Sequence, residues 1–385
     1  MSYRRVKLGR VLLRNSDEVP IEATEMYRTA GVYSYGRGLF ERPVISGSET
    51  SYRSYFRLHE GQFVYSKLFA WEGAVAVVEP SFDGLFVSSE FPTFDIDPDV
   101  ALSEYIAALC RWPEFHRAVA GGRSGLGVRR QRVNPERLLS VEVPLPDLSE
   151  QQRIVARLAK LLGEVDVIEE RLGRNDPALI VALYPGLVAR RLAAEAVRSQ
   201  PVGELVQFVN DLVRPGEPTG PAQVFVGLQH VESHTGRRIG SLPLGGEKGR
   251  KFRFQPGDIV YGYLRPYLNK VWVADTYGLC SVDQYVLRPT NGVPASYLAH
   301  ALRSRATLDQ AIELTHNLQL PRLRSGLLAS LEIPVIAPER VSPLVEELDQ
   351  ALETIVYARA LRLRQDRVIK GLRESVLNRA FAGEL

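Results

Sequence analysis

The chain is 385 residues long, with 45% hydrophobic and 24% charged residues, so it can form two or more globular units and is not disordered throughout. Its formal net charge of +3 does not by itself indicate nucleic-acid binding, which needs clustered cations. The N-terminus lacks the apolar run of a signal peptide, so we expect a cytoplasmic protein with no membrane partner. Cys110 and Cys280 lack CxxC spacing and predict two buried thiols rather than a disulfide or a zinc site.

Residues 1–147 form the first predicted domain. β-Branched and aromatic residues gather in Phe63–Tyr65 and Ala74–Val78, between Gly and Pro residues, which is typical of short strands. The Ala-rich segment Ser103–Cys110 predicts a helix. We therefore expect a domain of mixed α and β structure.

Arginines cluster after this helix, between Arg111 and Arg137, where few acids occur. Arginine suits DNA because its planar fork can form two hydrogen bonds to guanine or to a phosphate. A solvated surface residue is the alternative for any single arginine. Lys67 is a stronger candidate because it is a polar residue in an apolar, tightly turned segment. The DNA-binding candidates of this domain are Lys67, Arg123, Arg129, Arg130 and Arg132.

Residues 148–199 have a helical period and form a predicted central spacer. Apolar side chains step by four and three residues through Ile154–Leu172, a heptad seam that predicts a coiled coil. A helix over Glu150–Leu172 would be about 35 Å long, which is close to one turn of B-DNA. A second helix is expected over Ala178–Val197, bent near Pro185.

Residues 200–338 form a second predicted domain that repeats the first at a period of roughly 190 residues. Lys7–Leu12 matches Pro201–Val206, and Gly61–Leu68 matches Gly257–Leu264. Further matches follow in the same order, which makes the repeat a strong signal. Its basic segments contain Asn and Gln side chains that could pair with adenine. The DNA-binding candidates here are Arg250, Lys251, Arg265, Asn269, Lys270, Gln319 and Arg322.

Residues 339–385 form the last predicted part, a C-terminal helical spacer with the same apolar stepping and nearly continuous helix. The predicted fold is therefore of the α+β class: two similar mixed α/β domains separated by long antiparallel coiled-coil helices, with a pseudo-twofold internal repeat. An apolar helix face suits a protein partner. The partner-binding candidates are Ile154, Leu158, Leu161, Val165, Leu348, Ile355, Leu372 and Phe381.

Five segments, spread along the chain, together resemble those of a known family. They are Gly61-Gln-Phe-Val-Tyr-Ser-Lys-Leu68, Pro144-Leu-Pro-Asp-Leu-Ser-Glu-Gln-Gln-Arg-Ile154, Gly257-Asp-Ile-Val260, Leu264-Arg-Pro-Tyr-Leu-Asn-Lys-Val271 and Ala380-Phe-Ala-Gly-Glu-Leu385. In this order they are similar to the target-recognition domains and conserved helices of type I restriction-modification specificity subunits. The resemblance spans nearly the whole chain. A departure is Ala337-Pro-Glu-Arg-Val341, where the first copy has Leu148-Ser-Glu-Gln-Gln152.

The resemblance implies a sequence-specific, non-catalytic subunit that reads double-stranded DNA. Each recognition domain would read a few base pairs of a bipartite, asymmetric target. The helices would bind two methyltransferase subunits, which carry S-adenosylmethionine, and these can in turn recruit restriction subunits that translocate DNA. No cofactor is expected in this chain.

The residues themselves give little support to catalysis. No methyltransferase tetrapeptide and no P-loop occur, and His230 and His234 are spaced by four residues only in a Gly-flanked loop segment. Two alternatives remain beside the favoured one. The chain could be the recognition subunit of a simpler methyltransferase-only or type II-like complex. It could also be a coiled-coil scaffold that binds proteins and does not read DNA.

Overall fold

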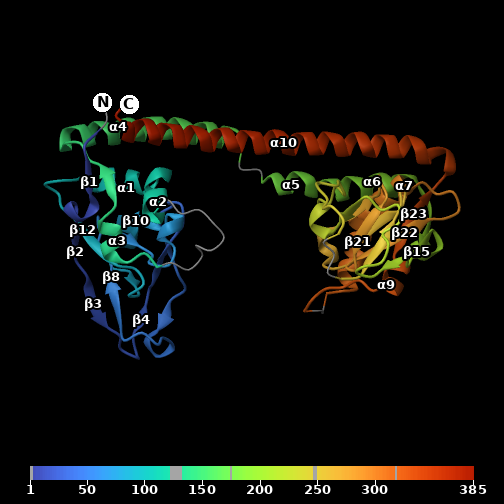
Figure 1. Cartoon of the computed structure of the whole chain (residues 1–385), viewed down its shortest axis with the longest axis horizontal. Coiled ribbons are helices and arrows are strands. Elements are labelled where there is room, and N and C mark those ends of the chain that lie inside the picture. The colour runs from blue at the N-terminus through green and yellow to red at the C-terminus, as the bar shows by residue number, and fades with distance from the viewer. Residues whose placement is uncertain (1–2, 122–131, 174–175, 246–248, 317–318) are drawn as a thin grey trace. The chain divides into compact units, whose positions relative to one another are not determined.

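The computed structural model describes residues 3–121, 132–173, 176–245, 249–316 and 319–385. The chain forms two compact units of mixed α and β structure (Figure 1). Unit 1 contains residues 1–174 and 366–385, and unit 2 contains residues 175–365. The predicted division into domains and spacers therefore differs from the observed one, because each helical segment packs on a globular part.

Unit 1 is built around a four-stranded antiparallel sheet in the order β10-β9-β12-β2. The sheet's strands are β2 (Leu12–Arg14), β9 (Phe63–Tyr65), β10 (Val75–Val77) and β12 (Thr93–Ile96). All three side chains of β9 are buried, because this strand is central and is covered on both faces. The smaller sheets are a three-stranded sheet in the order β11-β8-β3 and the two-stranded pairs β1-β13, β4-β7 and β5-β6. Their strands are β1 (Arg5–Lys7), β3 (Asp17–Pro20), β4 (Met26–Tyr27), β5 (Ala30–Val32), β6 (Leu39–Glu41), β7 (Ile45–Ser46), β8 (Ser54–Arg57), β11 (Phe86–Val87) and β13 (Glu142–Pro144).

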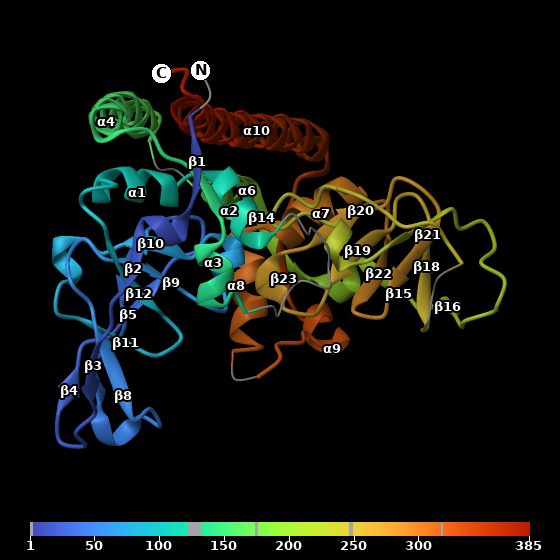
Figure 2. The ribbon, with the colours of Figure 1, turned by 60° about the vertical axis from the view of Figure 1, so that its left-hand side comes forward.

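Helices cover one side of this sheet in two layers. The first layer contains α1 (Ser103–Cys110) and α2 (Pro113–Ala120), while α3 (Pro135–Leu139) precedes β13. In the second layer α4 (Leu148–Arg171) lies beside the last part of α10 (Pro338–Ala382), as Figures 1 and 2 show. These two helices are antiparallel, since Arg373 pairs with Asp166 near the end of α4, whereas Phe381 packs with Ile154 in one core cluster.

Unit 2 has a four-stranded antiparallel sheet in the order β15-β22-β19-β20. Its strands are β15 (Val206–Val209), β19 (Ile259–Gly262), β20 (Val271–Val273) and β22 (Gln284–Pro289). A second sheet has the order β16-β18-β21-β17, and β14 pairs with β23. These strands are β14 (Ala196–Pro201), β16 (Leu212–Val213), β17 (Val224–Val226), β18 (Lys251–Phe254), β21 (Gly278–Ser281) and β23 (Glu332–Ile336).

The helices of unit 2 are α5 (Pro177–Ala182), α6 (Tyr184–Glu195), α7 (Ala295–Arg303), α8 (Arg305–Glu313), α9 (Ser325–Ala329) and the part of α10 up to Gln365. The helix predicted over Ala178–Val197 corresponds to α5 and α6. The predicted bend near Pro185 is present as a break at Leu183 between α5 and α6. The predicted helix end near Val197 is wrong, because β14 already begins at Ala196 and pairs with β23.

Among the described residues, one helical stretch, Pro177–Glu195, is long and apolar enough to cross a membrane by length and composition alone. A single stretch of this kind is weak evidence for a membrane span. Three of its side chains, Tyr184, Val188 and Leu192, are buried in the core of unit 2. Packing within unit 2 therefore explains part of its apolar character.

Candidate nucleic-acid interface

The clearest basic surface of unit 2 is built where two loops meet. The segment after β19 is bonded to the segment before α9, because Arg265 N–H donates to Pro321 O at 2.8 Å and Leu323 N–H donates to Tyr263 O at 3.0 Å. Leu264 and Arg322 consequently lie opposite one another as an antiparallel bridge. This pairing brings Arg265 and Arg322, 57 residues apart in the sequence numbering, onto adjacent backbone segments.

Three arginines on these loops are exposed: Arg265, Arg322 and Arg324. Within the part of the chain that the structure describes, no side-chain hydrogen bond or ion pair occupies their guanidinium groups. Tyr267 is 45% exposed beside them, and Gln319 is also exposed. We call these five residues the unit 2 basic surface. Unpaired arginines can meet phosphates or base edges without first breaking a contact within the protein.

A stacked tyrosine pair lies near Arg322 of this surface. The rings of Tyr263 and Tyr285 have centroids 4.5 Å apart and an interplanar angle of 27°. Burial raises the pKa of Tyr263, Asp283 raises it further, and the nearby Arg322 opposes the shift. Burial also raises the pKa of Tyr285. Both hydroxyls are therefore protonated at neutral pH, and the pair is uncharged.

Two predicted DNA contacts in the same loop are turned inward instead. Asn269 is only 3% exposed, and its amide nitrogen donates to Arg303 O at 2.9 Å. Lys270 donates through Nζ to Leu228 O at 2.7 Å, and burial lowers the pKa of its ammonium group. The prediction that Asn269 contacts adenine is wrong for this conformation, because its amide is enclosed and already bonded.

The other predicted cations of unit 2 lie on and beside β18. Arg250 is exposed, whereas Lys251 donates to Gly249 O at 3.0 Å and lies 5.3 Å from the centre of the Phe225 ring. On the same strand, Arg253 is paired with the carboxylate of Asp211. The charge of Arg253 is therefore neutralised within the protein, whereas the Lys251 ammonium bonds to uncharged carbonyl oxygens.

Unit 1 has a corresponding loop after β9, but its cationic side chains are already bonded within the protein. Lys67 N–H donates to Glu90 O at 2.9 Å, and Val133 N–H donates to Lys67 O at 2.8 Å. The Lys67 ammonium donates to Ser89 O at 2.7 Å, and Arg132 forms an ion pair with Glu90. The predicted contacts Arg123, Arg129 and Arg130 lie outside the described residues.

Sequence reasoning missed the exposed apolar and aromatic residues beside these loops. Leu68 and Phe69 in unit 1 are 44% and 50% exposed, and Tyr267 and Leu320 in unit 2 are both 45% exposed. An aromatic or aliphatic residue is read from sequence as part of a core by default. The only available signal was their position next to Lys67, Arg265 and Gln319.

The predicted partner-binding helix residues are mostly internal. Ile154, Leu158, Val165, Leu348 and Phe381 are at most 6% exposed, Leu161 and Ile355 are half-buried, and Leu372 is 42% exposed. The prediction that the seam faces a partner is therefore wrong for Ile154, Leu158, Leu348 and Phe381, because they pack in the cores of their own units. Val165 is also buried, at 6% exposure. Other apolar helix residues are exposed instead, including Val167, Ile168, Leu179, Leu183, Tyr357, Leu361 and Val368.

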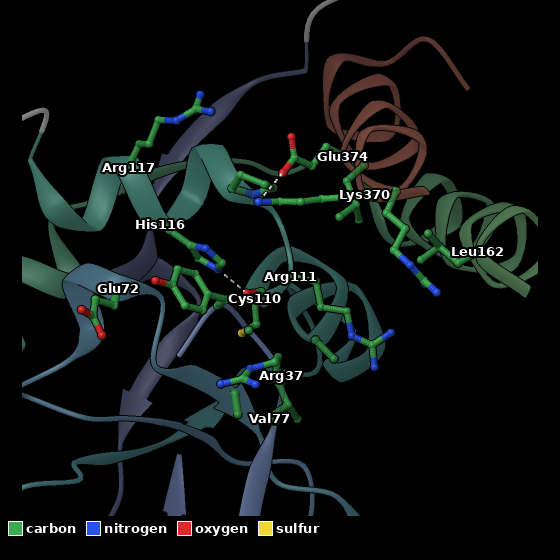
Figure 3. Close-up of a pocket in the computed structure, with 18 of the residues that line it drawn as sticks. Arg37, Glu72, Val77, Cys110, Arg111, His116, Arg117, Leu162, Lys370 and Glu374 are labelled. Carbon is green, nitrogen blue, oxygen red and sulfur yellow. Dashed lines mark hydrogen bonds and ion pairs between the residues drawn. The ribbon is translucent and has the colours of Figure 1, made fainter. Parts of the chain in front are cut away.

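A cavity of about 1170 Å³ lies in unit 1 against the ends of α1 and α2 (Figure 3). Its wall also includes α4 and α10. It is lined by the cations Arg37, Arg111, Arg117, Lys370 and Arg373 and by the anions Glu72, Glu79, Asp166 and Glu374. Since the two kinds of charge are nearly balanced, the cavity has no marked preference for a phosphate group.

Metal and thiol chemistry find no support among the described residues. No group of three or more His, Cys, Asp or Glu side chains in that part of the chain could hold a metal ion. Both cysteines are unpaired and buried, as predicted, and burial raises the pKa of the Cys280 thiol to about 12. Neither thiol is therefore a reactive nucleophile near neutral pH.

Comparisons with known proteins agree with the sequence resemblance. No family model matches the chain. A solved structure described as the structural basis of complex assembly and conformational transition of the type I R-M system aligns with a TM-score of 0.73 at 19% identity, covering 100% of this chain and 98% of that one. The crystal structure of the HsdS subunit from Thermoanaerobacter tengcongensis aligns over 100% of this chain and 97% of that one, with a TM-score of 0.49 and 20% identity.

The fold is thus one found in type I restriction-modification systems. The sequence defines the relationship further. It is 24% identical over 333 residues to the specificity subunit of the type I restriction enzyme EcoDI from Escherichia coli. The match covers 76% of this chain and 72% of that protein. The chain is therefore similar in sequence to a type I specificity subunit, and the predicted resemblance is confirmed.

Proposed function

We propose that this chain is the DNA-reading, non-catalytic subunit of a type I restriction-modification complex. Its relative from Escherichia coli is a specificity subunit. The observation in this chain that carries the proposal is the unit 2 basic surface, where Arg265, Arg322 and Arg324 are exposed without a bonded partner among the described residues. Arginines of this kind are suited to base edges and phosphates.

The two units are proposed to read the two halves of a split target. Support comes from corresponding contacts in both units. Leu8 N–H donates to Val141 O, and Val202 N–H donates to Leu331 O, both at 2.9 Å. The sheet orders β10-β9-β12-β2 and β20-β19-β22-β15 also correspond strand by strand. Because the loops differ in sequence, with Lys67 in unit 1 where unit 2 has Tyr263, the two half-sites should differ as well.

The helices are proposed to dock two methyltransferase subunits through the apolar residues that remain exposed. In unit 1 these include Val167 at 47%, Ile168 at 45% and Val368 at 55% exposure. In unit 2, Leu183 is 68% and Tyr357 is 65% exposed. Large side chains in such positions are suited to cover by another protein. The methyl donor S-adenosylmethionine would be bound by those partner subunits, which can also recruit restriction subunits.

The proposal is tested by sequencing DNA methylation in a host that expresses the methyltransferase genes with or without this chain. We expect a split motif that is methylated only when the chain is present. Purified complex should bind duplexes containing that motif more tightly than duplexes without it. A methylation pattern that does not depend on the chain, together with equal binding to all duplexes, would contradict the proposal and favour a protein-binding scaffold.

A further inference from the structure

The loop that holds Arg265 needs external support, because its backbone is strained at both ends. Arg265 has φ 55° and Asn269 has φ 48°, so both adopt the left-handed conformation that side chains other than glycine disfavour. The short turn Pro266–Leu268 lies between them. Residues in such conformations persist only where their surroundings fix them, and they gather at functional sites.

Asn269 supplies that support from inside unit 2. Its amide nitrogen donates to Arg303 O at 2.9 Å, and its own carbonyl accepts from His234 N–H at 3.0 Å. With 3% exposure it has no access to DNA. Its contacts therefore anchor the end of the turn to the end of α7, while Arg265 at the other end remains exposed.

Arg303 is the centre of this anchor. It is 6% exposed, and its guanidinium donates to Ala299 O at 3.0 Å and to Thr235 O, which lies in the loop beside His234. A side chain at Gly236 would collide with the guanidinium and with Val271 O at the start of β20. Arg303 thus joins the end of α7 to the loop at Thr235 through its guanidinium, and to Asn269 at the end of the turn through its backbone carbonyl.

A second set of contacts links Arg303 to α10. Its guanidinium lies 3.1 Å from His300 Nδ1, which accepts from the Tyr184 hydroxyl at 2.6 Å. His300 is 1% exposed, and its Nε2–H donates to the Asp349 carboxylate of α10 at 2.9 Å. Every member of this set belongs to unit 2. Arg303 is therefore connected to the Asp349 carboxylate through the imidazole ring of His300.

We infer that Asn269 and Arg303 are positioning residues that set the orientation of Arg265 and so determine the bases read by unit 2. The inference rests on the proposed function and deepens it. Neither residue touches DNA. Their contribution is to hold the strained turn in one conformation, so that the Arg265 fork meets its target in a fixed direction.

The test uses the full chain in complex with its methyltransferase subunits and synthetic duplexes. One duplex carries the motif found by methylation sequencing, and two others carry a substitution in one half only. Each half-substituted duplex gives one measured ratio, the affinity for the intact duplex divided by the affinity for that duplex. Arg265→Ala should lower one of the two ratios, and so identifies the half read by unit 2. Asn269→Gly keeps the left-handed backbone but removes the amide, and should lower that ratio roughly tenfold while leaving the ratio for the other half within about twofold.

Asn291→Gly is the matched control. Asn291 is also in unit 2, has φ 57° and is exposed, so the same substitution there should change neither ratio. A variant that merely weakens the fold would lower binding to all duplexes equally and leave both ratios unchanged, and that result would overturn the inference. If wild-type complex methylates no motif, or if Arg265→Ala changes neither ratio, the proposed function itself fails first. If Arg265→Ala changes one ratio and Asn269→Gly changes none, only this inference fails.

Discussion

In unit 1, Arg111 follows helix α1 and is exposed at the wall of the cavity, whereas in unit 2 Arg303 ends helix α7 and is buried. The two positions correspond, because Tyr105 O–H donates to Pro144 O at 2.9 Å and Tyr297 O–H donates to Pro334 O at 2.7 Å at the same distance along each helix. The two units therefore share this contact between helix and strand, but they differ in the burial of the arginine that follows it. Unit 2 uses its arginine to fix a loop, while unit 1 leaves the space beside Arg111 open.

The largest expected effect concerns these two arginines. Arg303→Ala should destabilise unit 2 by about 3 kcal/mol, because it removes the hydrogen bonds of a buried guanidinium to Ala299 O, Thr235 O and His300 Nδ1. Arg111→Ala should change the stability of unit 1 by less than about 0.5 kcal/mol, since its side chain is exposed. Hydrogen exchange of peptides from each unit measures both effects separately. Equal losses in the two units would show that Arg303 stabilises unit 2 no more than Arg111 stabilises unit 1.

A smaller effect separates unpaired from paired arginines on the surface of unit 2. Arg324→Ala should lower the slope of log affinity for DNA against log salt concentration by about 1, the value for one lost phosphate contact. Arg253→Ala should leave the slope unchanged, because Arg253 already pairs with Asp211. Fluorescence anisotropy with a labelled duplex over a range of salt concentrations measures the slopes. A larger change for Arg253→Ala than for Arg324→Ala would count against the proposed surface.

The smallest effect distinguishes the units by pH. Burial lowers the pKa of His230, His234 and His300 in unit 2, and that of His116 in unit 1. A histidine whose pKa is lowered in the folded state takes up its proton more readily when unfolded, so stability falls as the pH drops below about 6.5. Unit 2 should therefore lose more stability than unit 1 between neutral pH and pH 5. Hydrogen exchange at several pH values checks this, and a greater loss in unit 1 would contradict it.

The secondary structure was largely predictable because its signals are local. Ser103–Cys110 forms α1 as predicted, and the apolar segment Phe63–Tyr65 forms β9. The heptad seam correctly predicted a long helix over α4. The surface that the seam packs against was not predictable, because a periodic pattern shows that one face is apolar but does not show what covers it. In this chain the covering surface is the core of the same unit.

The candidate site was predictable only in outline. Arg265 and Asn269 are four positions apart in one short segment, yet one is exposed and the other is 3% exposed. Asn269 is held inside by its bond to Arg303 O, a contact between segments that are distant in sequence, and residue types alone do not reveal it. The pairing of Arg253 with Asp211 and of Arg132 with Glu90 likewise depends on contacts between segments that are distant in sequence.

Methylation sequencing with the variant Arg265→Ala/Arg322→Ala tests most directly whether unit 2 reads its own half of a split target. We expect the wild-type chain to direct methylation to a motif with two separated halves. In the double variant one half should become degenerate while the other half and the spacing stay unchanged. A motif that keeps both halves intact, or one in which both halves relax together, would show that unit 2 does not read a half of its own.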